Sequence, residues 1–200
     1  MIGLTSEELH FLAAAHGIET VAGLGPLPLD PADAASLRLM RGTAGRSLRA
    51  RGLIESPEIA SLLEPVGDPE WFATAVRSDK TARAWSRRGP RVTELARLAP
   101  TDYALSALDP ASIRGRIADF LALHGDDAGQ AEPETPDEER MRALLAPPAW
   151  VGEATRAVHG DMVALQWIDP GEGGSVWLLS GGDPVQVTRT GRAAILARLS

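Results

Sequence analysis

The chain has 200 residues, a formal net charge of −7 and no cysteine, and 44% of its residues are hydrophobic. The lack of cysteine excludes disulfides, thiolate metal sites and cysteine nucleophiles, and the negative charge argues against general affinity for nucleic acid. No secretory signal is visible, and no apolar run approaches the roughly 20 residues of a membrane span, so we expect a cytoplasmic protein without membrane attachment.

Helical periodicity dominates the first third of the chain. The first predicted helix covers residues 6–16, with Ser6 as its N-cap and Gly17 closing it. The proline-rich stretch 24–29 is expected to be extended, either as an edge strand or as a packed loop. A longer helix is expected from Asp30-Pro31 to Arg51-Gly52, and a third begins at Ser56-Pro57.

From Trp71 the apolar period changes from helical to two, which is typical of strands. Turn residues separate the strands, and their close spacing predicts an antiparallel meander. Another helix is expected from Asp109-Pro110, with Ile113 and Ile117 on its apolar face. The four predicted strands cover residues 72–76, 81–86, 92–98 and 103–108.

Residues 124–137 are rich in Gly, Asp, Glu and Pro and have almost no apolar side chain, which predicts a linker or a disordered loop. We therefore expect one globular domain made of a first unit over residues 1–123 and a shorter second unit over residues 138–200.

The second unit repeats the pattern of the first. Trp167 follows Trp85 by 82 residues, and Gly171 follows Gly89 by the same number. This offset fits without a gap from Asp79 onward, whereas Trp150 against Trp71 needs a small insertion or deletion. We interpret the pattern as a duplication. It predicts an α+β fold in which two helix–meander–helix units, related by a quasi-two-fold axis, share a central antiparallel sheet flanked by helices.

No arrangement of catalytic or metal-binding residues is found in the sequence. His10 and His16 are six residues apart, which does not suit a metal pair on one helix face, and residues 42–47 lack the Lys-Ser/Thr ending of a phosphate loop. The acidic residues of 126–139 fit a solvated linker better than a cation site. We therefore expect no catalytic residue, metal or cofactor, and an enzyme of unrecognised type is only a minor hypothesis.

Four arginines surround one predicted turn: Arg83, Arg87, Arg88 and Arg91. Such a cluster is typical of a solvated hairpin tip, and it also suits a loop that contacts a protein partner. An alternative function is a winged-helix DNA-binding transcriptional regulator, because residues 47–54 (SLRARGLI) resemble the junction between a recognition helix and a wing. The acidic charge and the late start of the strands argue against that alternative.

The order of elements resembles the EspG family of type VII (ESX) secretion chaperones of actinobacteria. The resemblance lies in Glu7-Glu8-Leu9, the extended Leu27-Pro28-Leu29, the helix ending in 47–54, Leu62-Leu63, the meander, and the helix from Asp109-Pro110, with a degenerate second copy behind them. The chain is shorter than typical members, and its second half lacks their longer helical segments.

The resemblance implies a cytoplasmic, non-catalytic chaperone that binds PE–PPE heterodimers at the apolar tip of the PPE helices. It also implies that the loop over residues 86–91 and the C-terminal helix take part in binding. Whether the chain forms a homodimer is left open by the sequence. The positions that correspond to the family's partner-binding regions are Arg87, Arg88, Gly89, Arg91, Ile195 and Leu199.

Overall fold

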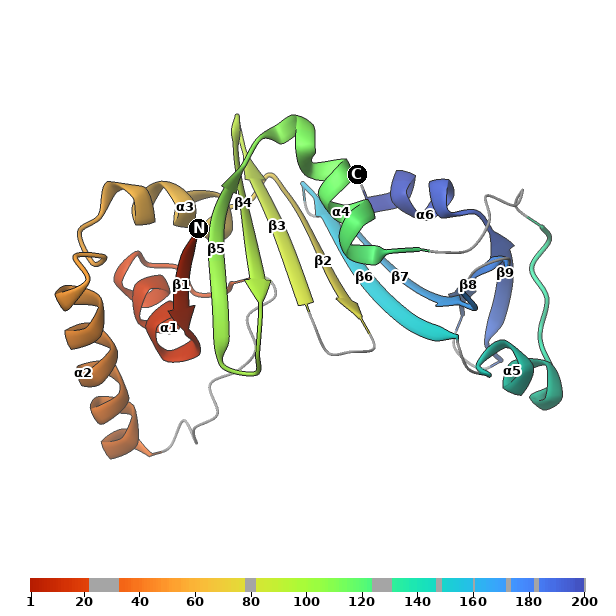
Figure 1. Cartoon of the computed structure of the whole chain (residues 1–200), viewed down its shortest axis with the longest axis horizontal. Coiled ribbons are helices and arrows are strands. Elements are labelled where there is room, and N and C mark those ends of the chain that lie inside the picture. Colours follow the sequence, from red (N-terminus) through yellow and green to blue (C-terminus); the bar gives the residue numbers. More distant parts are fainter. Residues whose placement is uncertain are drawn as a thin grey trace. The chain divides into compact units, whose positions relative to one another are not determined.

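The computed structural model describes residues 1–21, 33–77, 82–123, 131–146, 149–159, 161–171, 174–181 and 184–199. These residues form nine strands, which pair in antiparallel ladders, and six α-helices, so the predicted α+β class is confirmed (Figure 1). The chain divides into two compact units, Met1–Phe72 with Ala82–Pro110, and Ala73–Thr81 with Ala111–Ser200.

The first unit joins three helices to an antiparallel sheet with the strand order β1-β5-β4-β3. Strand β1 was not expected from the sequence, because four residues are too few to show a period, and it pairs with β5 from Ile2 opposite Leu105 onward. The elements are β1 (Ile2–Thr5), α1 (Ser6–Ala15), α2 (Ala34–Ala50), α3 (Pro57–Gly67), β3 (Ala82–Arg88), β4 (Arg91–Arg97) and β5 (Asp102–Leu108).

Two helix starts differ from the sequence-based prediction. The N-cap of α1 is Thr5 rather than Ser6, because Thr5 and Glu8 form a capping box in which each side chain accepts the other's backbone N–H. Helix α2 begins at Ala34, with Asp33 as an N-cap that accepts from two backbone N–H groups of the first turn, and the expected start at Asp30-Pro31 lies outside the described residues. Ser56 caps α3 as predicted, and residues 24–29 lie outside the described part of the chain.

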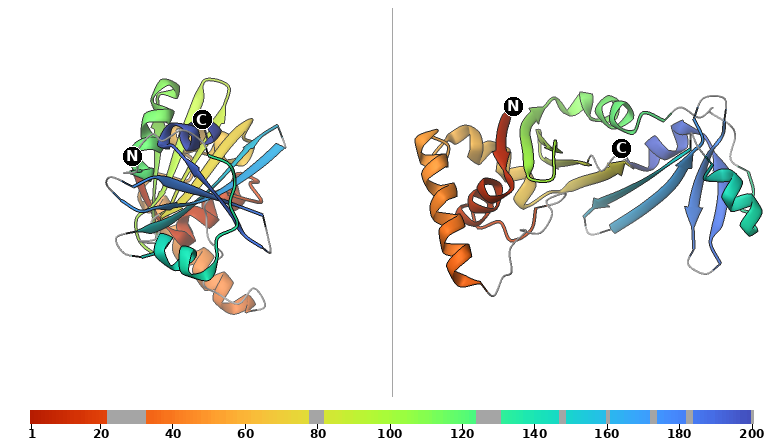
Figure 2. Two further views of the ribbon diagram at one scale, coloured as in Figure 1. Left: turned by 90° about the vertical axis from the view of Figure 1, so that its right-hand side faces the viewer. Right: turned by 60° about the horizontal axis from the view of Figure 1, so that its bottom comes forward.

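The core of the first unit lies between its helices and one face of its sheet. Helix α3 contacts β3, β4 and β5, while α1 and α2 lie side by side in every view (Figures 1 and 2). The largest apolar side chains of this core are Leu9, Leu12, Leu48, Ile59, Leu63, Tyr103 and Leu105.

The second unit contains a longer antiparallel hairpin and three helices, with the strand order β2-β6-β7-β8-β9. Strand β2 (Trp71–Arg77) is divided at Ala73, since its first two residues belong to the first unit. The other elements are α4 (Ile113–Leu121), α5 (Glu138–Leu144), β6 (Trp150–Val158), β7 (Asp161–Asp169), β8 (Val176–Ser180), β9 (Gln186–Thr190) and α6 (Arg192–Leu199). A 3₁₀ turn, Pro110–Ser112, precedes α4 where an α-helical start was expected.

Part of the predicted linker is ordered against the sheet. Glu134 and Val187 exchange backbone hydrogen bonds of 2.8 and 2.9 Å, and the Ala131 N–H donates to the Arg189 carbonyl. Ala131 and Glu134 of the predicted linker therefore lie along the edge of β9, whereas residues 124–130 of it lie outside the described part of the chain. The unit boundary also differs from the predicted one at residue 123, since α4 belongs to the second unit.

The two halves follow the same order of elements: α3-β2-β3-β4-β5-α4 is repeated as α5-β6-β7-β8-β9-α6. Trp85 and Trp167 are both fully buried, and Gly89 and Gly171 both have positive φ. The constant offset of 82 residues does not describe how β8 pairs with β7. Glu94 stands opposite Trp85, whereas Leu178 stands opposite Trp167, two residues further along than a constant offset gives. Common ancestry of the halves stays a prediction.

Candidate functional site

The tip of the β3–β4 hairpin carries four of the six residues that the sequence singles out. Arg88 and Arg91 form the last pair of the ladder, and Gly89 lies in the turn between them with φ of +55°. A residue with a Cβ rarely adopts that conformation, which explains a glycine at this turn. Arg87, Gly89 and Arg91 are exposed.

Acidic side chains from the end of α3 and the residues after it surround this hairpin tip. Arg88 forms an ion pair with Asp68 and lies 4.0 Å from Glu64, and Arg91 pairs with Glu64. The Gly89 N–H donates to Glu70 at 3.1 Å. Such exposed pairs contribute only about 0–1 kcal/mol each, so their main effect is to hold the arginines in place.

The sequence analysis named the arginines and missed their partners. Glu64 and Asp68 are four residues apart at the end of a predicted helix and therefore lie on one face, which is a readable signal. Because these acids offset much of the local positive charge, the tip is a mixed-charge surface and not a basic patch.

Ile195 and Leu199 lie in the core of the second unit, with 1% of each exposed. Both are on the buried face of α6, which contacts β6. In this conformation they stabilise the packing of α6 and are not available to a partner. The resemblance that suggested them as contacts therefore points to positions whose side chains face inward here, and we do not keep them in the candidate site.

A second surface feature is an apolar groove of about 530 Å³ beside α1 and α2. Leu39, Met40 and Ala44 contribute its apolar lining, and Leu39 is 70% exposed. Glu7 and Glu8 add acidic groups to the groove. Sequence reasoning missed the groove because Leu39 lies off the helical spacing of the apolar residues Leu37, Met40, Ala44 and Leu48.

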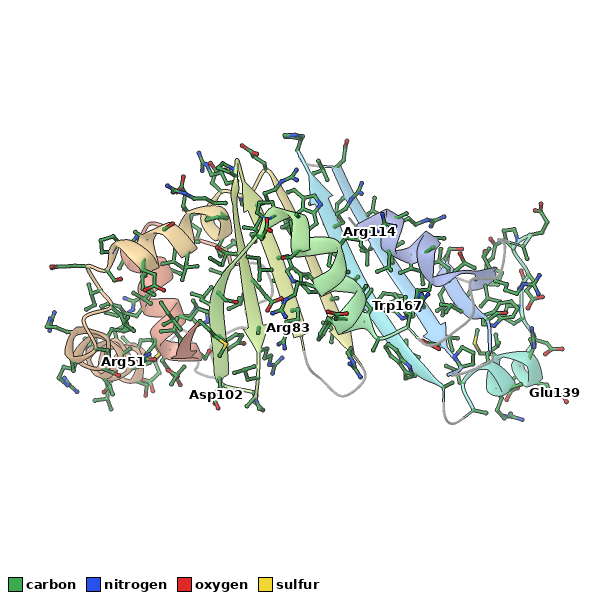
Figure 3. All side chains as sticks on the ribbon, turned by 45° about the horizontal axis from the view of Figure 1, so that its top comes forward. Arg51, Arg83, Asp102, Arg114, Glu139 and Trp167 are labelled. Atoms are coloured by element: carbon green, nitrogen blue, oxygen red, sulfur yellow. The ribbon has the colours of Figure 1, made fainter. Side chains whose placement is uncertain are left out.

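Glu8 joins α1 to α2 from the wall of this groove. Its carboxylate accepts from the Ser47 hydroxyl at 2.6 Å and from the Arg51 guanidinium at 2.9 Å, and Arg51 also donates to the Gly3 carbonyl. Figure 3 labels Arg51 among the side chains of the first unit. Burial raises the pKa of Glu8, but the hydrogen bonds from Ser47, the Thr5 N–H and Arg51, together with the charge of Arg51, outweigh it. The pKa of Glu8 is therefore lowered from its usual 4.5.

The same contacts bear on the DNA-binding alternative. Arg51, which belongs to the segment 47–54 that suggested this alternative, forms an ion pair with Glu8 and donates to the Gly3 carbonyl. The segment 47–54 ends α2, a helix that packs on α1. The strands that follow α3 form a four-stranded meander, whereas a winged helix has only a short wing at this place in the chain. No observation supports DNA binding.

Within the described residues, no group of three or more His, Asp or Glu side chains could hold a metal ion, and no helix is both long and apolar enough to cross a membrane.

No protein-family model matches the chain, and no curated protein sequence matches it. A solved structure does: the type VII secretion system chaperone EspG5 of Mycobacterium tuberculosis, determined in complex with a PE25–PPE41 dimer. The two chains share a fold. The superposition has a TM-score of 0.57 and covers 98% of this chain and 92% of the other, at 12% sequence identity. At this identity the likeness establishes the fold alone, and membership of the EspG family stays a prediction.

Proposed function

We propose that this chain is a non-catalytic, cytoplasmic chaperone or adaptor of the EspG type that serves type VII secretion in an actinobacterium. The observation that carries the proposal is the likeness to EspG5, which extends over 98% of the chain and so includes both units. The hairpin tip described above adds support, because a mixed-charge surface with an exposed arginine suits contact with a protein partner.

The proposed client is a secreted helical protein of the PE–PPE kind, bound at an apolar helix tip. Burial of that tip would supply most of the affinity, and Arg87, Arg88 and Arg91 would set its orientation. Arg88 and Arg91 are already held by acids of the first unit, which lowers the entropy lost when they meet a client carboxylate. Arg87 is exposed and is the arginine of this turn best placed for a direct contact.

Co-expression with a PE–PPE heterodimer from the same host tests the proposal. We expect a soluble ternary complex, and we expect Arg87→Glu to weaken it at least tenfold in a titration by calorimetry. Arg38→Glu is the matched control, since Arg38 is an exposed arginine on α2, away from the hairpin, and its loss should change the Kd less than twofold.

A second variant tests the turn itself. Gly89→Val forces a β-branched residue into positive φ, so the tip should rearrange and the affinity should fall even though no charge changes. Binding that is unaffected by either variant would remove the hairpin from the site, and the absence of any complex would remove the client. The sequence leaves a homodimer open, and no observation decides it.

A further inference from the structure

Residues 131–146, which we call the strap, lie along the outer edge of β9, the last strand in the sheet order of the second unit. Glu134 and Val187 exchange backbone hydrogen bonds of 2.9 and 2.8 Å, and the Ala131 N–H donates 3.0 Å to the carbonyl of the next outward-facing residue, Arg189. Helix α5, which belongs to the strap, packs against the same end of the sheet (Figure 1). These are the hydrogen bonds of an added strand, so the strap occupies a place where another extended segment could pair.

Arg140 joins the strap to the sheet through its side chain. Its guanidinium lies 4.9 Å from the centre of the Trp177 ring on β8, and its Nε donates to the Glu134 carboxylate at 3.3 Å. The Arg140 N–H donates to Asp137, the N-cap of α5, at 2.7 Å. One planar guanidinium therefore stacks on an indole and bonds a carboxylate at once, which holds the extended part of the strap and α5 to β8.

The strap buries little apolar surface. Leu144 is its only buried residue, and the structure describes every residue of the strap. Leu144 belongs to a small core cluster with Ile168 and Val187, and the half-buried Met141 packs against that cluster. A segment with few buried side chains and solvent-exposed hydrogen bonds opens at a lower free energy than the core beneath it.

We propose that the strap is a releasable ligand of the β9 edge, which opens as one unit and then admits an extended segment of a protein partner. Opening uncovers the outward backbone groups of Val187 and Arg189, together with the apolar side chain of Ile168. The partner segment is recognised by main-chain hydrogen bonds to β9 and by an apolar side chain that replaces Leu144. While closed, the strap shields this edge from chance pairing.

Hydrogen exchange tests the opening, because the Val187 and Glu134 amides donate across the contact between the strap and β9. Arg140→Ala removes both the stacking and the ion pair, so it should speed exchange of these two amides at least tenfold. Exchange of the β6–β7 ladder should stay unchanged, because that ladder does not open with the strap.

Arg142→Ala is the matched control, since Arg142 lies on the same helix and pairs with Glu138 of that helix. It should change the exchange of the strap less than twofold. Equal effects of the Arg140 and Arg142 variants, or strap amides that exchange only together with the β6–β7 ladder, would overturn the proposal.

A synthetic peptide of residues 131–146 tests whether the edge accepts an external segment. In a fluorescence anisotropy titration it should bind the Arg140→Ala protein at least tenfold more tightly than the wild type, because the intact strap of the wild type competes at a high effective concentration. The same peptide with Arg140→Ala should bind the variant more weakly. Equal affinity for both proteins, or no binding to the variant, would overturn the proposal, which does not depend on the chaperone function.

Discussion

Gly152 is a position where the structure predicts a large effect of a single methyl group. It stands opposite Trp167 in the β6–β7 ladder, and a Cβ built on it would meet the indole Cζ2 at 2.3 Å and Cε2 at 2.5 Å. Carbon atoms pack best at about 3.5–4.0 Å, and the indole is fully buried and cannot swing into solvent. Gly152→Ala should therefore destabilise the chain by about 3 kcal/mol, the upper end of the usual cost of overpacking.

Denaturant unfolding followed by tryptophan fluorescence measures this loss. At the usual conversion for a chain of this length, about 3 kcal/mol corresponds to a fall in Tm of roughly 6–12 °C. Gly115→Ala is the matched control, because nothing lies within 4 Å of its Cβ and alanine is the better helix former by up to about 1 kcal/mol.

A double-mutant cycle identifies the cause. Trp167→Leu removes the atoms that the new methyl group would meet, so Gly152→Ala should cost much less in that background than in the wild type. A cost within 0.5 kcal/mol of zero in the wild type, or the same cost in both backgrounds, would show that Gly152 is not needed for the packing of Trp167.

Three further predictions concern the first unit. Glu8→Gln should flatten the pH dependence of the free energy of unfolding. Because the pKa of Glu8 is lowered in the folded state, the stability that its charge contributes is complete above the ordinary pKa of 4.5 and is lost as the pH falls through the folded-state pKa. Unfolding curves of the variant and the wild type at several pH values will measure the difference. Thr5→Ala removes the cap of α1 and should cost about 1 kcal/mol in urea unfolding. Glu94→Leu leaves the Trp85 indole N–H without its 2.8 Å acceptor and should cost about 1–3 kcal/mol, whereas Glu94→Gln, which keeps an acceptor oxygen, should cost less in the same assay.

The Trp85–Glu94 pair also shows how the two halves differ. In the first unit the buried indole donates to a carboxylate from the opposite strand, whereas in the second Leu178 occupies that cross-strand place. The Trp167 N–H is buried without a hydrogen-bond partner among the described residues. The two tryptophans keep the same packing position, and the polar half of the interaction is present in one unit only.

The elements with strong periodicity were predictable from the sequence, and the contacts at a distance were not. Alternating apolar residues and turn glycines were sufficient to predict the meander, because both reflect local backbone preferences. Thr5 rather than Ser6 is the N-cap of α1 because the Glu8 carboxylate accepts from the Thr5 N–H. The position of that carboxylate depends in turn on its hydrogen bond from Arg51, 43 residues away. A one-dimensional pattern does not contain that information.

The candidate site was predictable to the same extent. Arg87, Arg88, Gly89 and Arg91 do lie at a hairpin tip, as their turn chemistry indicated. The pairing of Arg91 with Glu64 and the burial of Ile195 arise from tertiary packing and could not be read from spacing. The sequence did not identify Leu39 as a candidate, because an exposed leucine is informative only once the groove beside it is known.

The most direct test of the proposed function is whether this chain keeps a secreted helical client in solution. A tagged chain co-expressed with PE–PPE heterodimers of its host should elute with one of them as a single species of defined stoichiometry, and that heterodimer should be less soluble when expressed alone. If every heterodimer elutes separately and is equally soluble with and without the chain, the protein shares the fold of a type VII secretion chaperone without its activity.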